Sequence, residues 1–310
     1  KRVRCWGNNG FGQIGDNSTT DRTIPTLTAD IGDTVFHAAI LTSQTECSSG
    51  SYQPSYGQSS CIEASTGHYV DTSGSATQTP CGLGTWNNMT GQVACTNASA
   101  GYFVDTNGST AQTPCALGTW NNMTGQSSCT PASPGHYVDT NGSTSETPCD
   151  AGTYNPSNGS NSSADCGDVP AGSFSGPGAS APTPCSIGTW QDQAGQSSCM
   201  DADVGHYVDT NGSTTQTPCG LGTWNNMTGQ SSCTPASPGH YVDTNGSTTQ
   251  TPCDAGTYNP NSSSNSSSDC GDVPAGSFSG PGASSPTQCS PGTWQDQAGQ
   301  SSCMDADVGH

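Results

Sequence analysis

The chain has 310 residues, of which 29% are apolar, and it carries 24 acidic residues against only four lysines and arginines. Typical soluble domains are roughly 45–50% apolar, so this composition excludes two ordinary globular domains with large cores. The formal net charge of −20 opposes contact with phosphate backbones, and this excludes nucleic acid as a partner.

Residues 1–45 differ in kind from the rest of the chain. They contain all four basic residues, which are Lys1, Arg2, Arg4 and Arg22. The run CWGNNGFGQIGD at residues 5–16, with the Thr-rich turn that follows it to Pro25, resembles one repeat of the regulator-of-chromosome-condensation propeller family. The resemblance covers barely one blade. It implies a β-rich, propeller-blade-like segment and does not extend to the nucleotide-exchange activity known in that family.

From residue 46 to residue 310, cysteines recur at regular spacing. Gaps of 14 and 20 residues alternate, except that 17 and 19 replace them in two places, so the unit has 34 residues with a 36-residue variant. The units begin at Cys47, Cys81, Cys115, Cys149, Cys185, Cys219, Cys253 and Cys289. Three units form a super-repeat of 104 residues, and residues 115–206 differ from residues 219–310 at 10 of 92 positions.

This cysteine pattern indicates a disulfide framework from an oxidising compartment, because cysteines this dense and regular stabilise chains that lack a large core. The chain has 17 cysteines, and no two of them in the repeats are closer than 14 positions. A structural zinc site would instead need closely paired cysteines. We therefore expect an extracellular or cell-surface protein.

Each unit is predicted to contain two half-units, each with a Gly-x-aromatic core, such as Gly118-Thr119-Trp120 and Gly135-His136-Tyr137. Pro, Gly, Asn and Ser interrupt the chain every few residues and no window shows a helical apolar period, so strands and turns are expected. The Asn-Gly pair at Asn141 signals a tight hairpin. The predicted fold is a small disulfide-rich β fold, an elongated tandem array of short cystine-stapled hairpins.

The pattern Cys-x-x-Gly-Thr-Trp/Tyr, a loop of 10–13 residues, a second cysteine and a second Gly-x-aromatic half resembles the cysteine-rich repeats of ephrin receptors and tumour necrosis factor receptors, over residues 47–310. In those families the second half usually has its own cysteine pair. Here Ala132 and Ala236 stand at the expected first position and no partner follows. The second half of each unit is therefore expected to lack a disulfide.

The same resemblance implies that nearest-neighbour cysteines are paired. The implied disulfides are Cys47–Cys61, Cys81–Cys95, Cys115–Cys129, Cys149–Cys166, Cys185–Cys199, Cys219–Cys233, Cys253–Cys270 and Cys289–Cys303. The alternative register pairs cysteines across the 20-residue gaps, for example Cys95 with Cys115. Cys5 is then left over, either free or bonded to a part of the protein outside this sequence.

Thirteen Asn-x-Ser/Thr sequences make N-glycosylation the expected modification in an extracellular protein. The acceptors are Asn17, Asn88, Asn97, Asn107, Asn122, Asn141, Asn158, Asn161, Asn211, Asn226, Asn245, Asn261 and Asn265. Asn155 and Asn259 are excluded because proline follows each of them.

Other candidate sites have simpler interpretations. The Gly-His-Tyr and terminal Gly-His histidines lack a second ligand type at metal spacing and are expected to be structural or exposed; they are His68, His136, His206, His240 and His310. The Asp-Thr-Asn-Gly-Ser runs bear a faint likeness to calcium loops but lack the terminal Glu; they begin at Asp105, Asp139, Asp209 and Asp243. We expect turns there, with calcium bridging as the alternative, and no other cofactor.

No run of residues approaches the roughly 18–20 apolar residues of a membrane span, and no motif for nucleophilic catalysis is present. The expected function is that of a secreted, glycan-coated structural rod, a stalk or fibre subunit that contacts copies of itself. The alternative is a receptor or adhesin ectodomain that binds a protein along its repeats. Near-identical units favour the rod, because a ligand site usually needs one or two units to diverge. The chain begins at Lys1 in the middle of a pattern, and its last seven residues repeat Met200–His206. Both ends are therefore expected to continue in a longer polypeptide.

Overall fold

A computed structural model describes residues 4–7, 22–27, 46–55 and 58–307. The chain divides into two compact units, the first made of Lys1–Glu46 and Ser55–Cys61, the second of Cys47–Pro54 and Ile62–His310. In the first unit, β1 (Arg4–Gly7) pairs antiparallel with β2 (Arg22–Leu27), and the register shifts between Cys5 and Gly7. Most of the propeller-like motif, including the Asn17 acceptor, lies outside the described residues.

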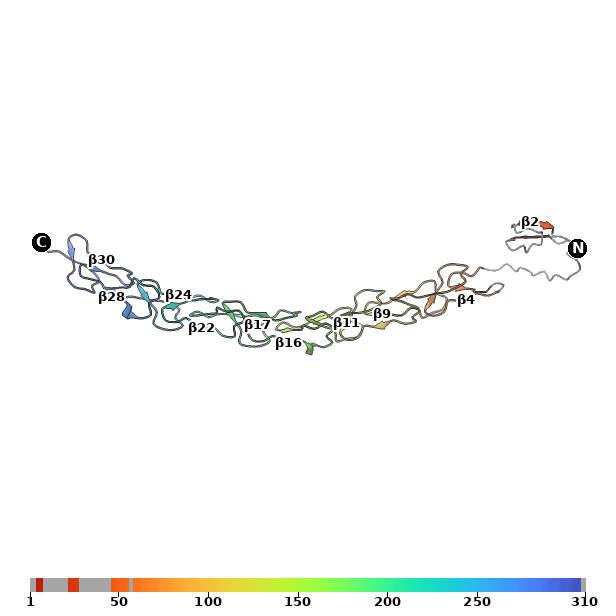
Figure 1. The fold of residues 1–310 in the computed structure, drawn as a ribbon, viewed down its shortest axis with the longest axis horizontal. Coiled ribbons are helices and arrows are strands. Elements are labelled where there is room, and N and C mark those ends of the chain that lie inside the picture. The colour runs from red at the N-terminus through yellow and green to blue at the C-terminus, as the bar shows by residue number, and fades with distance from the viewer. Residues whose placement is uncertain (1–3, 8–21, 28–45, 56–57, 308–310) are drawn as a thin grey trace. The chain divides into compact units, whose positions relative to one another are not determined.

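In the second unit, successive strands pair as antiparallel two-stranded hairpins (Figure 1). The first strands are β3 Ser51–Tyr52, β5 His68–Tyr69, β7 Thr85–Trp86, β9 Tyr102–Phe103, β11 Thr119–Trp120, β13 His136–Tyr137, β15 Thr153–Tyr154, β17 Ser173–Phe174, β19 Thr189–Trp190, β21 His206–Tyr207, β23 Thr223–Trp224, β25 His240–Tyr241, β27 Thr257–Tyr258, β29 Ser277–Phe278 and β31 Thr293–Trp294.

Each first strand has a return strand of two residues. The return strands are β4 Ile62–Glu63, β6 Thr79–Pro80, β8 Thr96–Asn97, β10 Thr113–Pro114, β12 Thr130–Pro131, β14 Thr147–Pro148, β16 Gly167–Asp168, β18 Thr183–Pro184, β20 Met200–Asp201, β22 Thr217–Pro218, β24 Thr234–Pro235, β26 Thr251–Pro252, β28 Gly271–Asp272, β30 Thr287–Gln288 and β32 Met304–Asp305. The two 36-residue units each add one short 3₁₀ helix, η1 Ser163–Asp165 and η2 Ser267–Asp269, closed by a capping box. The predicted tandem array of disulfide-rich hairpins is confirmed.

The hairpin of β11 and β12 shows how a half-unit folds. Trp120 lies opposite Thr130, and Thr119 lies opposite Pro131. Pro131 has no N–H to donate, which a two-stranded sheet tolerates because the return strand is an edge. Trp120 is half-buried, whereas the fully buried positions are small side chains such as Cys115 and Ala132, both 0% exposed. A core of such small side chains explains why so few apolar residues suffice.

Backbone hydrogen bonds join each hairpin to the next one along the chain. In the β11–β12 hairpin, the N–H of Gly118 donates to the carbonyl of Val138 at 2.8 Å, and the N–H of Asn121 donates to that of Ser143 at 3.1 Å. Both acceptors belong to the β13–β14 hairpin. The bond made by the first glycine recurs along the array, from Gly67 to Asn87 and from Gly222 to Val242, for example. Each hairpin therefore satisfies the backbone groups of its neighbour, which a two-residue ladder alone would leave unpaired.

A second set of bonds reaches across two hairpins. The N–H of Gly125, in the loop between β11 and β12, donates to the carbonyl of Ala98 at 2.8 Å, immediately after the β7–β8 hairpin. Gly142 makes the same bond to Cys115, and Gly159 to Ala132. Three consecutive hairpins are thus held together by backbone contacts, and we call the two sets of bonds together the interlock. The interlock supplies the stabilisation that one 34-residue unit lacks within itself.

The interlock requires the glycine at the start of each hairpin from β3–β4 to β27–β28. Gly118 has a φ of 79°, which L side chains rarely adopt, and a Cβ on it would lie 2.2 Å from the carbonyl oxygen of Gly159 two hairpins further along. A backbone oxygen at that distance leaves no room for any side chain. The glycine of the Gly-x-aromatic core therefore serves two purposes, since it allows both the sharp turn and the close approach of a distant loop.

The expectation of a tight hairpin at Asn141-Gly142 is wrong, because residues 138–146 separate β13 from β14. The Asn-Gly turn lies within this longer loop, where its glycine contacts Cys115 rather than its own hairpin. The halves that lack a cystine have the same strand pairing as the stapled halves, since His136 pairs with Pro148 and Tyr137 with Thr147.

Candidate functional site

Seven disulfides close alternate hairpins. They are Cys81–Cys95, Cys115–Cys129, Cys149–Cys166, Cys185–Cys199, Cys219–Cys233, Cys253–Cys270 and Cys289–Cys303, with Cα–Cα distances of 5.7–5.8 Å. Each joins nearest-neighbour cysteines, as the resemblance implied. Cys47 and Cys61 are also disulfide-bonded. The side chain of Cys5 lies outside what the structure describes.

Five of the seven described hairpins without a cystine are closed by a side chain whose role the sequence did not reveal; the β17–β18 and β29–β30 hairpins have Pro182 and Pro286 at this position instead. Gln112 occupies the place of the second cysteine, and its Oε1 accepts a hydrogen bond at 2.7 Å from the backbone N–H of Ser99, the residue after Ala98. The same bond joins Ser65 to Gln78, Ser133 to Glu146, Asp203 to Gln216 and Ser237 to Gln250. We call this contact the glutamine clamp. A Gln or Glu directly before Thr-Pro in the unstapled halves was the available signal.

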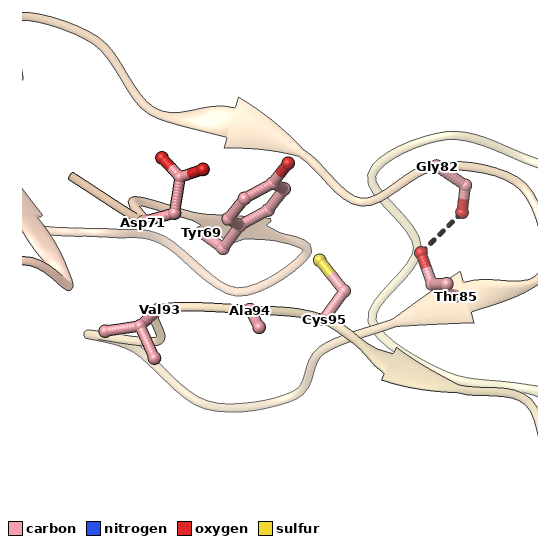
Figure 2. Close-up of a pocket in the computed structure, with 7 residues that line it drawn as sticks. All are labelled: Tyr69, Asp71, Gly82, Thr85, Val93, Ala94 and Cys95. Carbon is pink, nitrogen blue, oxygen red and sulfur yellow. Dashed lines mark hydrogen bonds between the residues drawn. The ribbon is translucent and has the colours of Figure 1, made fainter.

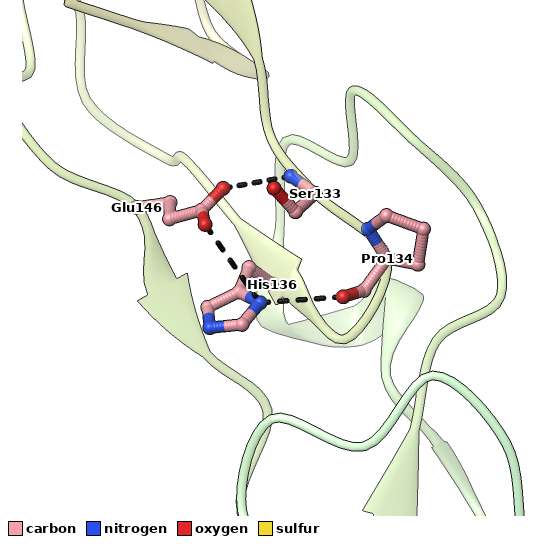
Figure 3. Close-up of polar contacts among 4 residues, drawn as sticks. All are labelled: Ser133, Pro134, His136 and Glu146. Atoms are coloured by element: carbon pink, nitrogen blue, oxygen red, sulfur yellow. Dashed lines mark hydrogen bonds and ion pairs between the residues drawn. The ribbon is translucent and has the colours of Figure 1, made fainter.

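Glu146 is the one carboxylate among these five clamp residues. Its Oε2 accepts the hydrogen bond from Ser133, and its Oε1 lies 4.0 Å from Nδ1 of His136 (Figure 3). The same Nδ1 lies 3.3 Å from the carbonyl oxygen of Pro134. His68, His206 and His240 have an equivalent carbonyl at 3.2–3.3 Å, so these imidazoles have local partners. His310 lies outside the described residues.

The acceptor asparagines that the structure describes are all exposed; they are Asn88, Asn97, Asn107, Asn122, Asn141, Asn158, Asn161, Asn211, Asn226, Asn245, Asn261 and Asn265. The buried asparagines are different residues, namely Asn87, Asn121, Asn155, Asn225 and Asn259. Asn121 donates to the carbonyl of Tyr102 at 3.2 Å and accepts from the N–H of Met123 at 3.0 Å. Within each Asn-Asn pair, one side chain therefore stabilises the hairpin contact and the next one is exposed to solvent.

This division predicts the pattern of N-glycosylation. We expect sugar on the exposed acceptors and none on Asn121 or Asn225, because neither of these two is followed by Ser or Thr two residues later and both side chains are buried. Enzymatic deglycosylation in heavy-oxygen water, followed by peptide mass spectrometry, marks each modified asparagine. Label on Asn121, or unlabelled acceptors throughout the array, would contradict the assignment.

A shallow pocket of about 420 Å³ lies near the start of the array (Figure 2). It is lined by Tyr69, Asp71, Gly82, Thr85, Val93, Ala94 and Cys95. Val93 is 49% exposed, and the corresponding residues of the other 34-residue units are serines, as in Ser127-Ser128 and Ser231-Ser232. This unit therefore carries an apolar pair at a surface that is polar elsewhere.

Among the described residues, no three His, Cys, Asp or Glu side chains are grouped so that they could hold a metal ion. The carboxylates considered for calcium are exposed, and those of Asp105, Asp139 and Asp243 each accept a hydrogen bond from the following threonine at 3.0–3.1 Å. Apart from Glu146, every described Asp and Glu is exposed, so the array presents a negatively charged surface.

In the part of the chain that the structure describes, no helix is long and apolar enough to span a membrane. Comparison with protein-family models and with curated proteins gives no match. The regular disulfides are typical of an extracellular cysteine-rich repeat protein, because such frameworks form and persist in oxidising compartments.

Proposed function

We propose that the chain is a secreted structural glycoprotein whose array of hairpins provides length, as a stalk or as the subunit of an extracellular fibre. The observation that carries this proposal is the interlock, in which each hairpin makes the same backbone contacts to the next two. Repeat arrays stabilised by nearest-neighbour contacts can be lengthened without changing their local structure. Near-identical units then add length and no new site, and no catalytic role is proposed.

The surface of the array supports the same proposal. Acceptor asparagines recur on successive hairpins, at Asn107, Asn122 and Asn141 for example, and all three are exposed. Sugar at these positions, together with the exposed carboxylates, would keep the sides of neighbouring arrays hydrated and apart and would leave contact between copies to their ends. We further propose that the similarity to ephrin-receptor and tumour necrosis factor receptor repeats is one of architecture, and that the propeller-like segment is a separate module.

Removal of one whole unit tests whether the array provides length. Deletion of residues 115–148 joins Pro114 to Cys149, which recreates the Pro148–Cys149 junction and keeps every hairpin contact in register. We expect a folded, secreted chain whose length in electron micrographs is shorter by a constant increment, and deletion of residues 219–252 should give the same length. A deletion that prevents secretion or changes the width of the particle would contradict the proposal.

The receptor or adhesin alternative is favoured by one observation, the divergent pocket at Val93 and Ala94. An exposed apolar pair beside the carboxylate of Asp71 would suit a partner that offers an alkyl chain ending in a cation, such as a lysine side chain. Under this alternative, replacement of Val93 and Ala94 by the serines of the other units abolishes binding to a lysine-rich peptide. Under the structural proposal, the replacement has no effect on assembly or secretion.

A further inference from the structure

The Asn-Gly turns in the hairpin loops carry a chemistry that the structural role does not use. Five such turns are described, at Asn107, Asn141, Asn158, Asn211 and Asn245, and the asparagine of each is exposed. Every glycine that follows has a φ of 72–75°. Asn-Gly is the dipeptide in which asparagine is most readily attacked by the next backbone nitrogen, because glycine has no side chain to hinder the attack.

The reaction is a deamidation that needs only water. The backbone nitrogen of Gly142 attacks Cγ of Asn141, the Cγ–Nδ2 bond breaks, and Nδ2 leaves as ammonia with the proton that the glycine nitrogen has lost. Water then opens the five-membered imide at either carbonyl, which gives aspartate or isoaspartate. Each event adds one negative charge to a chain that already carries −20. No oxidant or reductant takes part.

The interlock holds the attacking nitrogen. The N–H of Gly142 donates to the carbonyl of Cys115 at 2.8 Å, that of Gly108 to Cys81 at 2.8 Å and that of Gly246 to Cys219 at 2.7 Å. A nitrogen that donates to a backbone carbonyl in this way keeps its proton and cannot rotate towards Cγ. The turn is also braced by a side chain, since Oγ of Ser143 donates to the carbonyl of Thr140 at 2.8 Å.

All five of these asparagines are also glycosylation acceptors, and a sugar on Nδ2 would block the reaction. We propose that, in chains whose acceptor carries no sugar, the Asn-Gly turns are latent deamidation sites that the inter-hairpin hydrogen bond protects, so that the opening of a hairpin contact leaves a permanent carboxylate. The acceptor carbonyl at Asn107, Asn141, Asn211 and Asn245 belongs to the first cysteine of a disulfide. At Asn158 the acceptor is Ala132, in a hairpin closed without a cystine. Loss of a disulfide by a thiol reductant would therefore convert a reversible opening into an irreversible change of charge.

One substitution opens a single turn. A Cβ on Gly101 would lie 2.1 Å from the carbonyl oxygen of Gly142 and would displace the Asn141 turn. The turn at Asn245 has nearly the same surrounding sequence, and the glycine that faces it is Gly205. Asn245 therefore serves as a control site inside the same molecule as Gly101→Ala.

The experiment uses the full chain, secreted under inhibition of N-glycosylation so that Nδ2 is free. The intact protein, the Gly101→Ala variant and the reduced, urea-unfolded chain are incubated at mildly alkaline pH, and isoaspartate is measured at each site by peptide mass spectrometry. We expect all five turns of the intact protein to react at least about tenfold more slowly than in the unfolded chain. Gly101→Ala should accelerate isoaspartate formation at Asn141 and leave it slow at Asn245.

Equal rates in the intact and unfolded chains would overturn the proposal, and this comparison holds even if the variant fails to fold. Faster deamidation at both Asn141 and Asn245 in a folded variant would also overturn it, because the local inter-hairpin hydrogen bond would then not be what protects each site. Selective acceleration at Asn141 is the result that supports it.

Discussion

Replacement of Gly222 by alanine is expected to lower the free energy of unfolding by about 3 kcal/mol, the sum of a left-handed backbone penalty and of overpacking. Gly222 has a φ of 78°, and a Cβ on it would lie 2.3 Å from the carbonyl oxygen of Ser263. The new methyl group must therefore displace the loop of the hairpin two positions further along. The measurement is urea unfolding followed by tryptophan fluorescence, with hydrogen exchange to locate the opened hairpins.

Gly220→Ala is the matched control, only two residues away. A Cβ at Gly220 meets nothing within 4 Å, and the corresponding residue of an earlier unit is Ala116. We expect stability to be unchanged or raised by about 0.5 kcal/mol, because alanine restricts the unfolded chain. If Gly220→Ala and Gly222→Ala were equally destabilising, the cost would come from glycine loss in general and not from the interlock.

The second large effect is expected when a stapled hairpin is converted into a clamped one. Replacing Cys115 and Cys129 by alanine removes a disulfide that closes a loop of about 15 residues and should cost about 3 kcal/mol. Cys115→Ala with Cys129→Gln should cost about 2 kcal/mol, since the new glutamine can accept from the N–H of Ala116 as Gln112 accepts from Ser99, for a net gain of about 1 kcal/mol. Ala98 shows that alanine fits the position of Cys115, because both residues are 0% exposed.

Both double variants are compared by urea unfolding under identical conditions. The conclusion depends on the difference between alanine and glutamine at position 129, and not on the loss of the disulfide itself. If the glutamine variant were no more stable than the alanine variant, the glutamine clamp would not be the substitute for a cystine that we infer.

Much of the fold could be predicted from the sequence because its signals are local and repeated. Cysteine spacing gave the unit length, and Gly-x-aromatic pairs such as Gly118-Thr119-Trp120 marked each first strand. The contacts between hairpins could not be predicted in the same way. They are made by backbone N–H and carbonyl groups, as from Gly125 to Ala98, and every residue except proline has both groups. No side-chain pattern therefore points to the partner two hairpins away.

The candidate sites show the same limit. Asn121 and Asn122 are adjacent and identical in type, yet Asn121 is 5% exposed and Asn122 is a surface residue. The sequence separated them only through the acceptor rule, which Asn122 satisfies. Gln112 carried a weak signal, its place before Thr113-Pro114, but a glutamine in a polar loop has no chemistry that marks it as a substitute for cysteine. Its role became visible only with the N–H of Ser99 beside it.

Small-angle X-ray scattering of the glycosylated chain tests the central claim, that these hairpins form an extended array that provides length. A compact globule of 310 residues has a radius of gyration of about 19–20 Å. We predict a value well above this, with a cross-section that stays constant when residues 115–148 are removed. A radius of gyration of about 20 Å for the monodisperse, disulfide-bonded protein would contradict the account.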